Sequence, residues 1–333
     1  MAVQELIAED LQQKSKGHLS RAWARLIRKK IAVACMVVLA IIYVGGIFAP
    51  LVAPYGYTDQ DYRSIKKPPS WDHLAGTDLK GRDVLTRVLW GIQNTVIITL
   101  VVMGTGGIVI GVTLGLVSGY FRRKIDAVIM RVGELFSSFP DIFLMILIAA
   151  TLRPRILEWV RWLEDNTFAD GIVKSGIVDY FAISIALVSF SWIGMARLVR
   201  GQVLALMQTQ FVESAQAVGA STPRILFVHL LPNAISPVVV TVSMGMGALV
   251  GTEIILSFLG LGIQPPRPSL GTMLLEAGSL SALREVPWML LAPGLVAWTL
   301  VLAWNLLGDA LNDVLNADTF VADLDAHLVS EGA

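Results

Sequence analysis

The sequence has little charge and almost no cysteine. Charged residues make up 16% of its 333 residues and hydrophobic residues 55%, whereas soluble domains carry about 25% charge. The 26 basic and 26 acidic residues cancel, so the chain lacks the basic footprint that nucleic-acid binding requires. The one cysteine, Cys35, lies in an apolar run, which excludes a disulfide framework and a cysteine-based metal site. High hydrophobicity without net charge also excludes a disordered chain.

Long apolar runs are what the chain has instead. A helix needs about 20 mostly apolar residues to cross the hydrocarbon core, at about 1.5 Å per residue. Six segments qualify, at residues 31–53, 95–117, 127–152, 181–196, 238–262 and 288–308. The first is too long for a signal peptide and lacks a small-residue cleavage site, so we expect a retained anchor. The sequence therefore predicts an all-α integral membrane protein with six transmembrane helices, a multi-pass protein of the cell membrane.

Basic residues next to the spans predict the orientation. One cluster, residues 28–30, adjoins the first span, and another, residues 122–124, fills the short link between the second and third spans. Lys and Arg near span ends favour the cytoplasmic side, whereas long loops carry little weight. We therefore expect both termini to be cytoplasmic.

Two outer loops show helical patterns. In the first, residues 54–90, the sequence from Asp83 onward is amphipathic and predicts an interfacial helix that leads into the second span. The second, residues 153–180, contains Trp159 and Trp162 among mixed charges, which is typical of a small amphipathic helix resting at the interface.

The inner loop between spans four and five, residues 197–237, carries the most information. Its helical pattern over Gln208–Val218 ends at Gly219, a residue suited to the left-handed conformation that terminates a helix. Two short helices joined at this glycine predict a compact cytoplasmic projection.

Prolines mark further boundaries. Ser221 or Thr222 can cap a second helix of the inner loop with Pro223 at its first position. We expect Pro232 to break that helix, and residues 264–268 of the last outer loop to be extended rather than helical.

The inner loop resembles the EAA loop of permease subunits in binding-protein-dependent ABC importers. The matching residues, in the family's spacing, are Glu213, Ser214, Ala215, Gly219, Leu231 and Pro232. Ser214 stands where the second alanine is expected, and His229 stands where an apolar residue is expected.

Other motifs narrow the resemblance to the C-type branch of dipeptide, oligopeptide and nickel permeases. They are Gly76-Thr77-Asp78, Gly81-Arg82-Asp83, Arg87, Leu256–Gly262, Gln264-Pro265-Pro266 and Asn305–Asp309. The resemblance covers about residues 30–315. The outer loop 153–180 is longer than the branch leads us to expect.

The resemblance implies a transport subunit with the transmembrane fold of type I ABC importers. Implied partners are a homologous B-type permease, two P-loop ATPase subunits, an extracytoplasmic substrate-binding protein and the lipid bilayer. The inner loop would be the coupling helix that sits on an ATPase. The chain has no phosphate-binding G-x4-G-K-[ST] motif, so ATP and Mg²⁺ would be bound by the ATPase subunits and no cofactor by this chain.

Combining spans and resemblance divides the chain into four parts. Residues 1–30 form a cytoplasmic tail, and residues 31–93 hold the first span, the outer loop and the interfacial helix. Residues 94–312 form the permease core with five spans, and residues 313–333 form a cytoplasmic C-terminal tail.

Charged residues inside the spans are candidates for the translocation path or for inter-subunit contact. Arg131 and Glu134 are three residues apart, so a pair that neutralises both charges is the main interpretation and a path role the second. Glu253 lies deeper, without an obvious partner in its own helix. The four histidines are scattered and predict no metal site.

Three alternatives stay open at this point. The same architecture serves importers of nickel or another small solute. A secondary transporter or channel would show inverted repeats and several intramembrane acids. An intramembrane enzyme would need a nucleophile with a base, or paired aspartates, and no such set is present in the spans. We therefore predict a subunit that imports peptides and is not itself an enzyme.

Overall fold

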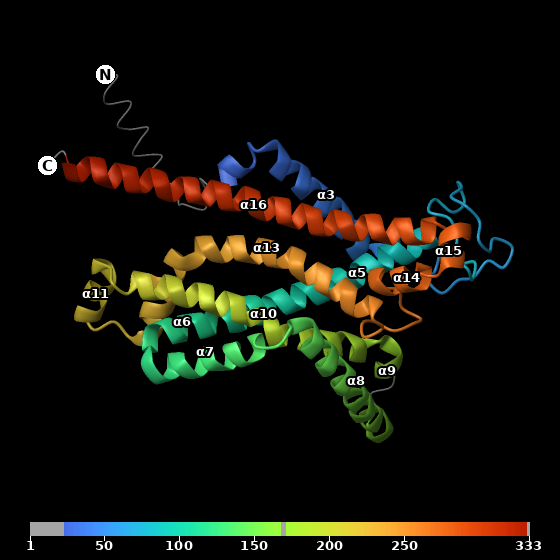
Figure 1. Cartoon of the computed structure of the whole chain (residues 1–333), viewed down its shortest axis with the longest axis horizontal. Helices are drawn as coiled ribbons and strands as arrows, with labels where there is room; N and C mark the ends of the chain where they lie inside the picture. Colours follow the sequence, from blue (N-terminus) through green and yellow to red (C-terminus); the bar gives the residue numbers. More distant parts are fainter. Residues whose placement is uncertain (1–22, 168–170, 332–333) are drawn as a thin grey trace, which may run out of the picture.

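A computed structural model describes residues 23–167 and 171–331 of the chain, which form an elongated bundle of helices (Figure 1). Most of the expected N-terminal tail, residues 1–22, and the last residues of the expected C-terminal tail, 332–333, lie outside this part. The helices are α3 Lys30–Ile47, α4 Ala49–Val52, α5 Val84–Val102, α6 Thr113–Phe121, α7 Arg123–Ser137, α8 Asp141–Asn166, α9 Ile172–Ser175, α10 Ile177–Leu206, α11 Gln210–Ala217, α12 Thr222–Arg224, α13 Leu231–Phe258, α14 Leu270–Ala277, α15 Leu280–Glu285 and α16 Trp288–Glu331, with π-helical segments η1 Met103–Val112 and η2 Ile225–Leu230.

The number of spans is the predicted six if one bent pair of helices counts as a span. Five continuous helical stretches in the described residues are long and apolar enough to cross a membrane, and the bent pair would be the sixth. The continuous ones are Lys30–Ile47, Val84–Phe121, Ile177–Leu206, Thr222–Phe258 and Trp288–Leu315. The predicted fold class is confirmed. The sides of the membrane on which the termini lie stay a prediction.

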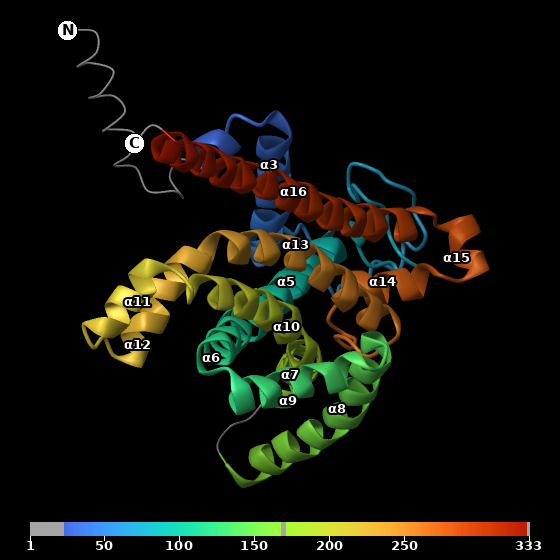
Figure 2. The ribbon, with the colours of Figure 1, turned by 60° about the vertical axis from the view of Figure 1, so that its left-hand side comes forward.

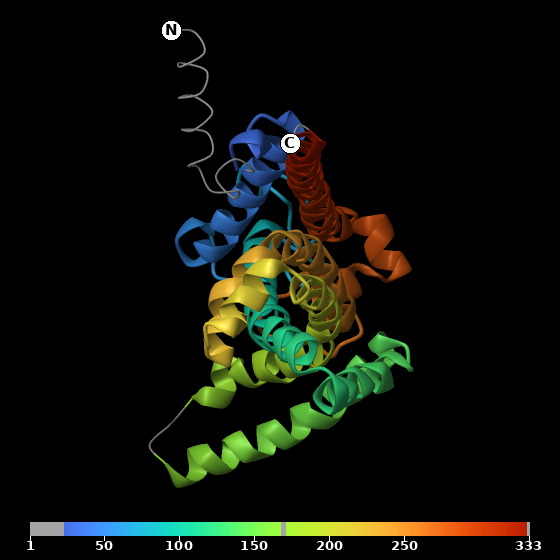
Figure 3. The same ribbon diagram turned by 90° about the vertical axis from the view of Figure 1, so that its left-hand side faces the viewer.

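The third span is not the single helix expected over residues 127–152. It consists of α7 and α8, which meet at 90°. The chain leaves the helical path at Ser138 and resumes it after Pro140, whose missing N–H and ring disfavour a continuous helix through the preceding residues. α7 and α8 form the edge of the bundle opposite α3 and α16 (Figure 3).

The prediction of an interfacial helix before the second span is right about the helix and wrong about its surroundings. The segment is helical from Val84, but it is buried and continues directly into the spanning helix. Asp83 caps it by accepting a hydrogen bond from the backbone N–H of Thr86 at 2.7 Å. The outer loop folds over this end of the helix, so the apolar side packs against protein instead of resting on lipid headgroups.

The separate small helix expected in loop 153–180 is also wrong. α8 continues through Pro154 to Asn166, so the loop is largely an extension of the third span. Trp159 and Trp162 are exposed along this extension, and the short α9 leads into α10.

Pro232 does not break the helix that contains it. The stretch Thr222–Phe258 is helical throughout, with Pro232 at the start of α13 and Pro237 inside it. The π-helical segment η2 lies directly before Pro232, where the hydrogen-bond register changes and the proline offers no N–H. By contrast, residues 264–268 are not helical, as predicted, but they form a turn with a cis bond between Pro265 and Pro266 instead of the extended path that was expected. α14 and α15, which no motif predicted, follow them.

Two of the four hydrophobic clusters in the described residues join most of the helices. One joins α3, α5, α13, α14 and α16, which lie together in Figure 2. The other joins α6 and α10 to the segment around α11 and η2. Glycines let α6 approach α10 closely, since a methyl group on Gly115 would come within 2.6 Å of the Val199 Cβ atom and one on Gly119 within 2.7 Å of the Val203 Cβ atom.

Candidate functional site

The inner loop forms a projection at one end of the molecule, where α11 lies beyond the ends of α10 and α13 (Figures 1 and 2). Val212 is buried and joins α11 to the cluster that includes Val203 and Leu230. The predicted helix and its end at Gly219 are confirmed, with φ at 82° for this residue.

A complete C-terminal cap fixes the exit from α11. The N–H of Ala220 donates to the carbonyl of Ala215 at 3.0 Å, and the N–H of Gly219 donates to the carbonyl of Gln216 at 2.9 Å. This pair of bonds is the Schellman motif, which needs a residue in the left-handed conformation. Ser221 stands at the N-cap of the next helix, although its side chain makes no capping bond, and Pro223 is its second residue.

The six residues that match the EAA motif lie along this projection. Glu213 and Ser214 are exposed on α11, and Ala215 is half-buried. Leu231 and Pro232 stand at the start of α13, where the projection returns to the bundle. The structure thus keeps one carboxylate and two small side chains accessible on a short, well-anchored helix.

Glu253 lies inside the bundle rather than on a surface. Its side chain is fully buried, and its carboxylate accepts hydrogen bonds from Thr95 Oγ1 and Ser257 Oγ, both at 2.7 Å. The expectation that it has no partner in its own helix is therefore wrong, because Ser257 is four residues further along α13. The carboxylate connects α13 to α5.

Arg131 and Glu134 form the predicted pair. Arg131 Nη1 lies 3.1 Å from Glu134 Oε2, and both side chains are exposed on α7. Gly133 is the one buried residue of this helix. At the start of α7, Arg200 on α10 contacts both oxygens of Asp126 at 2.5 and 2.6 Å.

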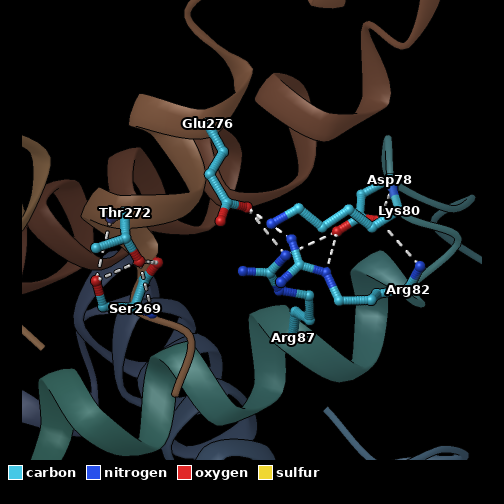
Figure 4. Close-up of polar contacts among 7 residues, drawn as sticks. All are labelled: Asp78, Lys80, Arg82, Arg87, Ser269, Thr272 and Glu276. Carbon is cyan, nitrogen blue, oxygen red and sulfur yellow. Dashed lines mark hydrogen bonds and ion pairs between the residues drawn. The ribbon is translucent and has the colours of Figure 1, made fainter. Parts of the chain in front are cut away.

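An ion cluster at the opposite end explains the Gly-Thr-Asp and Gly-Arg-Asp motifs. Asp78 Oδ2 accepts from Arg82 Nε at 2.6 Å and Arg87 Nη1 at 2.7 Å. Glu276 on α14 accepts from the same two guanidinium groups, at 3.0 Å from Arg82 and 2.9 Å from Arg87. Figure 4 shows the two carboxylates on either side of the two arginines. The cluster fastens the first outer loop and α5 to α14.

The environment of Asp78 favours its ionised form. Burial opposes this, but the backbone N–H of Arg82, its guanidinium and the backbone N–H of Lys80 outweigh it, so the pKa of Asp78 lies below its ordinary value. Nearby, a reciprocal capping box of Ser269 and Thr272 starts α14 (Figure 4).

Two neighbouring cavities run along α10 beside the joint of α7 and α8. One, of about 400 Å³, is lined by residues that include Ser137, Asp141 and Arg197. The other, of about 290 Å³, extends between α10 and α13 and includes Thr241 and Thr252 in its wall. Asp141 was missed at the sequence level, although a charged residue inside the segment 127–152 was the signal that would have found it.

Membrane-spanning helices, cavities along them and an anchored projection at one end define a membrane transport component. Comparison with known families makes this specific. Residues 111–320 match the family described as binding-protein-dependent transport system inner membrane component, and the chain belongs to this family. Residues 18–69 match the N-terminal transmembrane domain of oligopeptide transport permease C.

Similar proteins cover almost the whole chain. It is 33% identical to a dipeptide transport system permease protein of Alkalihalophilus pseudofirmus, over 89% of this chain and 88% of the relative. It is 33% identical to an oligopeptide transport system permease protein of Bacillus subtilis, over 93% and 92%. It is 36% identical to a glutathione transport system permease protein of Pectobacterium atrosepticum, over 88% and 89%. The predicted family and the membrane location are confirmed.

Proposed function

We propose that this permease forms half of the translocation path of an ATP-driven importer for short peptides. The named substrates of its relatives, which include dipeptides, oligopeptides and the tripeptide glutathione, support this substrate class. An external binding protein delivers the peptide, a homologous B-type permease supplies the other half of the path, and two P-loop ATPases bind ATP and Mg²⁺. This chain contributes no catalytic group.

The observation that carries the proposal is the projection formed by α11. Glu213 offers a carboxylate to a basic residue of an ATPase, and Ser214 and Ala215 permit close approach of its surface. Val212 and the cap at Gly219 hold the helix in place, so force applied to α11 passes into α10 and α13. Closure of the two ATPases around ATP then rocks these spans between an inward and an outward opening.

The charged residues of the spans receive separate roles in this proposal. Arg131 and Glu134 lie on α7, the least covered spanning helix, and contact the second permease. Glu253 acts as an internal link between α5 and α13. The functional core is residues 94–312 with its coupling loop 197–237, while residues 31–93 add the first span and the outer loop. The tails 1–30 and 313–333 face the cytoplasm.

Purification of the tagged chain from its native membrane tests the composition of the complex. We expect a second permease and two P-loop ATPase subunits to be recovered with it, and the reconstituted complex to import labelled peptide when ATP and loaded binding protein are present. Uptake by this chain alone, or recovery without ATPases, would refute the proposal. Import of nickel ions but not of peptide would show that the substrate is a metal ion and not a peptide.

The cap of α11 tests the coupling role directly. Gly219→Val forces a β-branched residue into the left-handed conformation, at a cost of about 1–2 kcal/mol or more, and displaces α11. We expect membrane insertion to persist while ATPase recovery and peptide uptake fall at least tenfold. Gly260→Val is the matched control, because Gly260 has φ of 79° and lies beyond the other end of α13.

The charge of α11 gives a second test. Glu213→Lys reverses an exposed charge without disturbing the buried anchor Val212, so the chain should fold and insert normally. We expect loss of ATP-driven uptake with an unchanged amount of chain in the membrane. Unchanged uptake in both the Glu213 and the Gly219 variants would show that α11 is not the coupling helix.

A further inference from the structure

An acid and a base line the same cavity without bonding to each other. Asp141 and Arg197 both belong to the wall of the 400 Å³ cavity at the joint of α7 and α8. Among the described residues, Asp141 accepts one hydrogen bond, from the backbone N–H of Ile142 at 2.8 Å. Arg197 Nη2 donates to Ser137 Oγ at 3.1 Å. Both charged groups therefore keep donor or acceptor capacity for a ligand.

The position of this cavity indicates that it contains water. Asp141 is the first residue of α8, directly after the joint with α7 in the bent span. Arg197 is 20 residues along α10 from Ile177, or about 30 Å. The cavity therefore lies towards the α11 end of the bundle, and charged side chains of spanning segments face the bundle interior or a hydrated cavity.

The cavity is one part of a longer groove. The second cavity, of about 290 Å³, shares Asp141, Phe190 and Gly194 with the first and continues to Thr252 near the far end of α13. Together they form a groove along α10, from Arg197 near the α11 end towards the end with the ion cluster.

We propose that this groove binds a zwitterionic peptide on its way through the membrane, with Asp141 holding the α-ammonium group and Arg197 the α-carboxylate. The proposal rests on the proposed function, because it assumes a peptide substrate. A carboxylate accepts charge-assisted hydrogen bonds from an ammonium group, and a guanidinium binds a carboxylate through two parallel bonds. Side chains of any kind would project into the remaining space.

The lone cysteine makes a clean labelling experiment possible. Cys35 is the one cysteine of the sequence, so Cys35→Ala gives a background in which this chain has no thiol of its own. Phe139→Cys then places a reporter in the wall of the charged cavity, and Leu147→Cys places a control on the exposed apolar side of α8, away from both cavities. In the purified complex, a charged, water-soluble thiol reagent should label the first reporter at least tenfold faster than the control.

Peptide protection tests the charges. Alanylalanine should slow labelling of the Phe139→Cys reporter, whereas N-acetyl-alanylalanine and alanylalanine amide should require at least tenfold higher concentrations. Asp141→Asn should raise the concentration of alanylalanine that gives half-protection about tenfold. Asp141→Glu, which keeps the carboxylate, should bring this concentration back close to the wild-type value. Glu158→Gln removes an exposed acid from the same helix and should change nothing.

Each outcome decides the proposal. An unreactive reporter would overturn the hydrated groove, and protection that is equal for all three probes, or unaffected by Asp141→Asn, would overturn the two-charge site. Ser137→Cys is a second reporter for the case that the Phe139 variant fails to assemble. Peptide uptake by the unmodified complex is measured in parallel. Uptake without peptide protection would refute the binding site and leave the proposed function intact. Protection without uptake would support the binding site and refute the proposed function.

Discussion

Asp78 is the residue on which the outer ion cluster depends. Asp78→Asn removes the carboxylate that both Arg82 and Arg87 contact and leaves buried positive charge with Glu276 as the remaining acid. Removing one partner of a buried pair costs about 3–5 kcal/mol, so we expect a clearly lower unfolding temperature of the purified chain in detergent. Lys80→Ala is the control, since Lys80 contributes its backbone N–H, which alanine retains. Equal stability of both variants would contradict this role.

The same carboxyl predicts a pH dependence. Because the pKa of Asp78 is lower in the folded chain than in the unfolded chain, its contribution to the free energy of unfolding is fully present above the ordinary carboxyl value of about 3.9. The contribution is lost as the pH falls through the folded-state pKa. The difference in unfolding temperature between wild type and Asp78→Asn should stay constant from pH 7 to about 5 and shrink only below about 4.

Glu253 separates a structural role from a path role. Glu253→Gln keeps one oxygen that accepts from Thr95 or Ser257, whereas Glu253→Ala leaves both hydroxyls without this acceptor. If Glu253 is an internal link, the Glu253→Gln variant should take up peptide at nearly the wild-type rate. The Glu253→Ala variant should lose about 1–3 kcal/mol in the free energy of unfolding. If glutamine abolished uptake while leaving stability unchanged, the carboxylate would have a transport role instead.

At the scale of elements, α7 yields the sharpest prediction. Arg131 and Glu134 form an exposed pair that no element within residues 23–167 and 171–331 covers, so the partner permease is the expected neighbour. Glu134→Arg places two positive charges together and should reduce recovery of the second permease several-fold. The double swap Arg131→Glu with Glu134→Arg restores the pair and should recover most of it. Equal recovery from all variants would remove α7 from the interface.

Periodic patterns in the sequence predicted most of the spanning helices, whereas contacts between distant residues determine where these helices begin and end. The sequence predicted the spans, the end of α11 at Gly219 and the absence of helix at residues 264–268, because these features depend on local chemistry. The start of the second span could not be placed, because its first turns are buried by contacts with distant residues, the hydrophobic cluster shared with α3, α14 and α16 and the ion pair with Glu276. The bend at Pro140 and the continuity through Pro232 depend on how neighbouring helices accommodate a missing N–H, which a local pattern does not contain.

The candidate site divides in the same way. The residues of the coupling loop are adjacent in the sequence and were found by spacing. The pairing of Glu253 with Thr95 joins residues 158 positions apart and required the structure. Asp141 gains significance from the cavity that it shares with Arg197 on α10, a proximity that no sequence interval reveals.

At the scale of the whole molecule, the prediction concerns the number of membrane crossings. Trp71 and Val218 are 96% and 90% exposed, in the first outer loop and beside α11. Six crossings place them on opposite sides, whereas a bent pair that does not cross would place them on the same side. In the Cys35→Ala background, an impermeant reagent should label Trp71→Cys in intact cells and Val218→Cys only after permeabilisation. Labelling of both in intact cells would mean five crossings.

The close contact of η1 and α6 with α10 prevents these helices from sliding along each other during transport. Gly111, Gly115 and Gly119 each fit against a side chain of α10, and those side chains, Met195, Val199 and Val203, are also four residues apart. Sliding one helix along the other by a single residue would drive side chains into backbone, while rotation of both helices together disturbs none of these contacts. The second and fourth spans therefore move together as one rigid body, with α11 at its end.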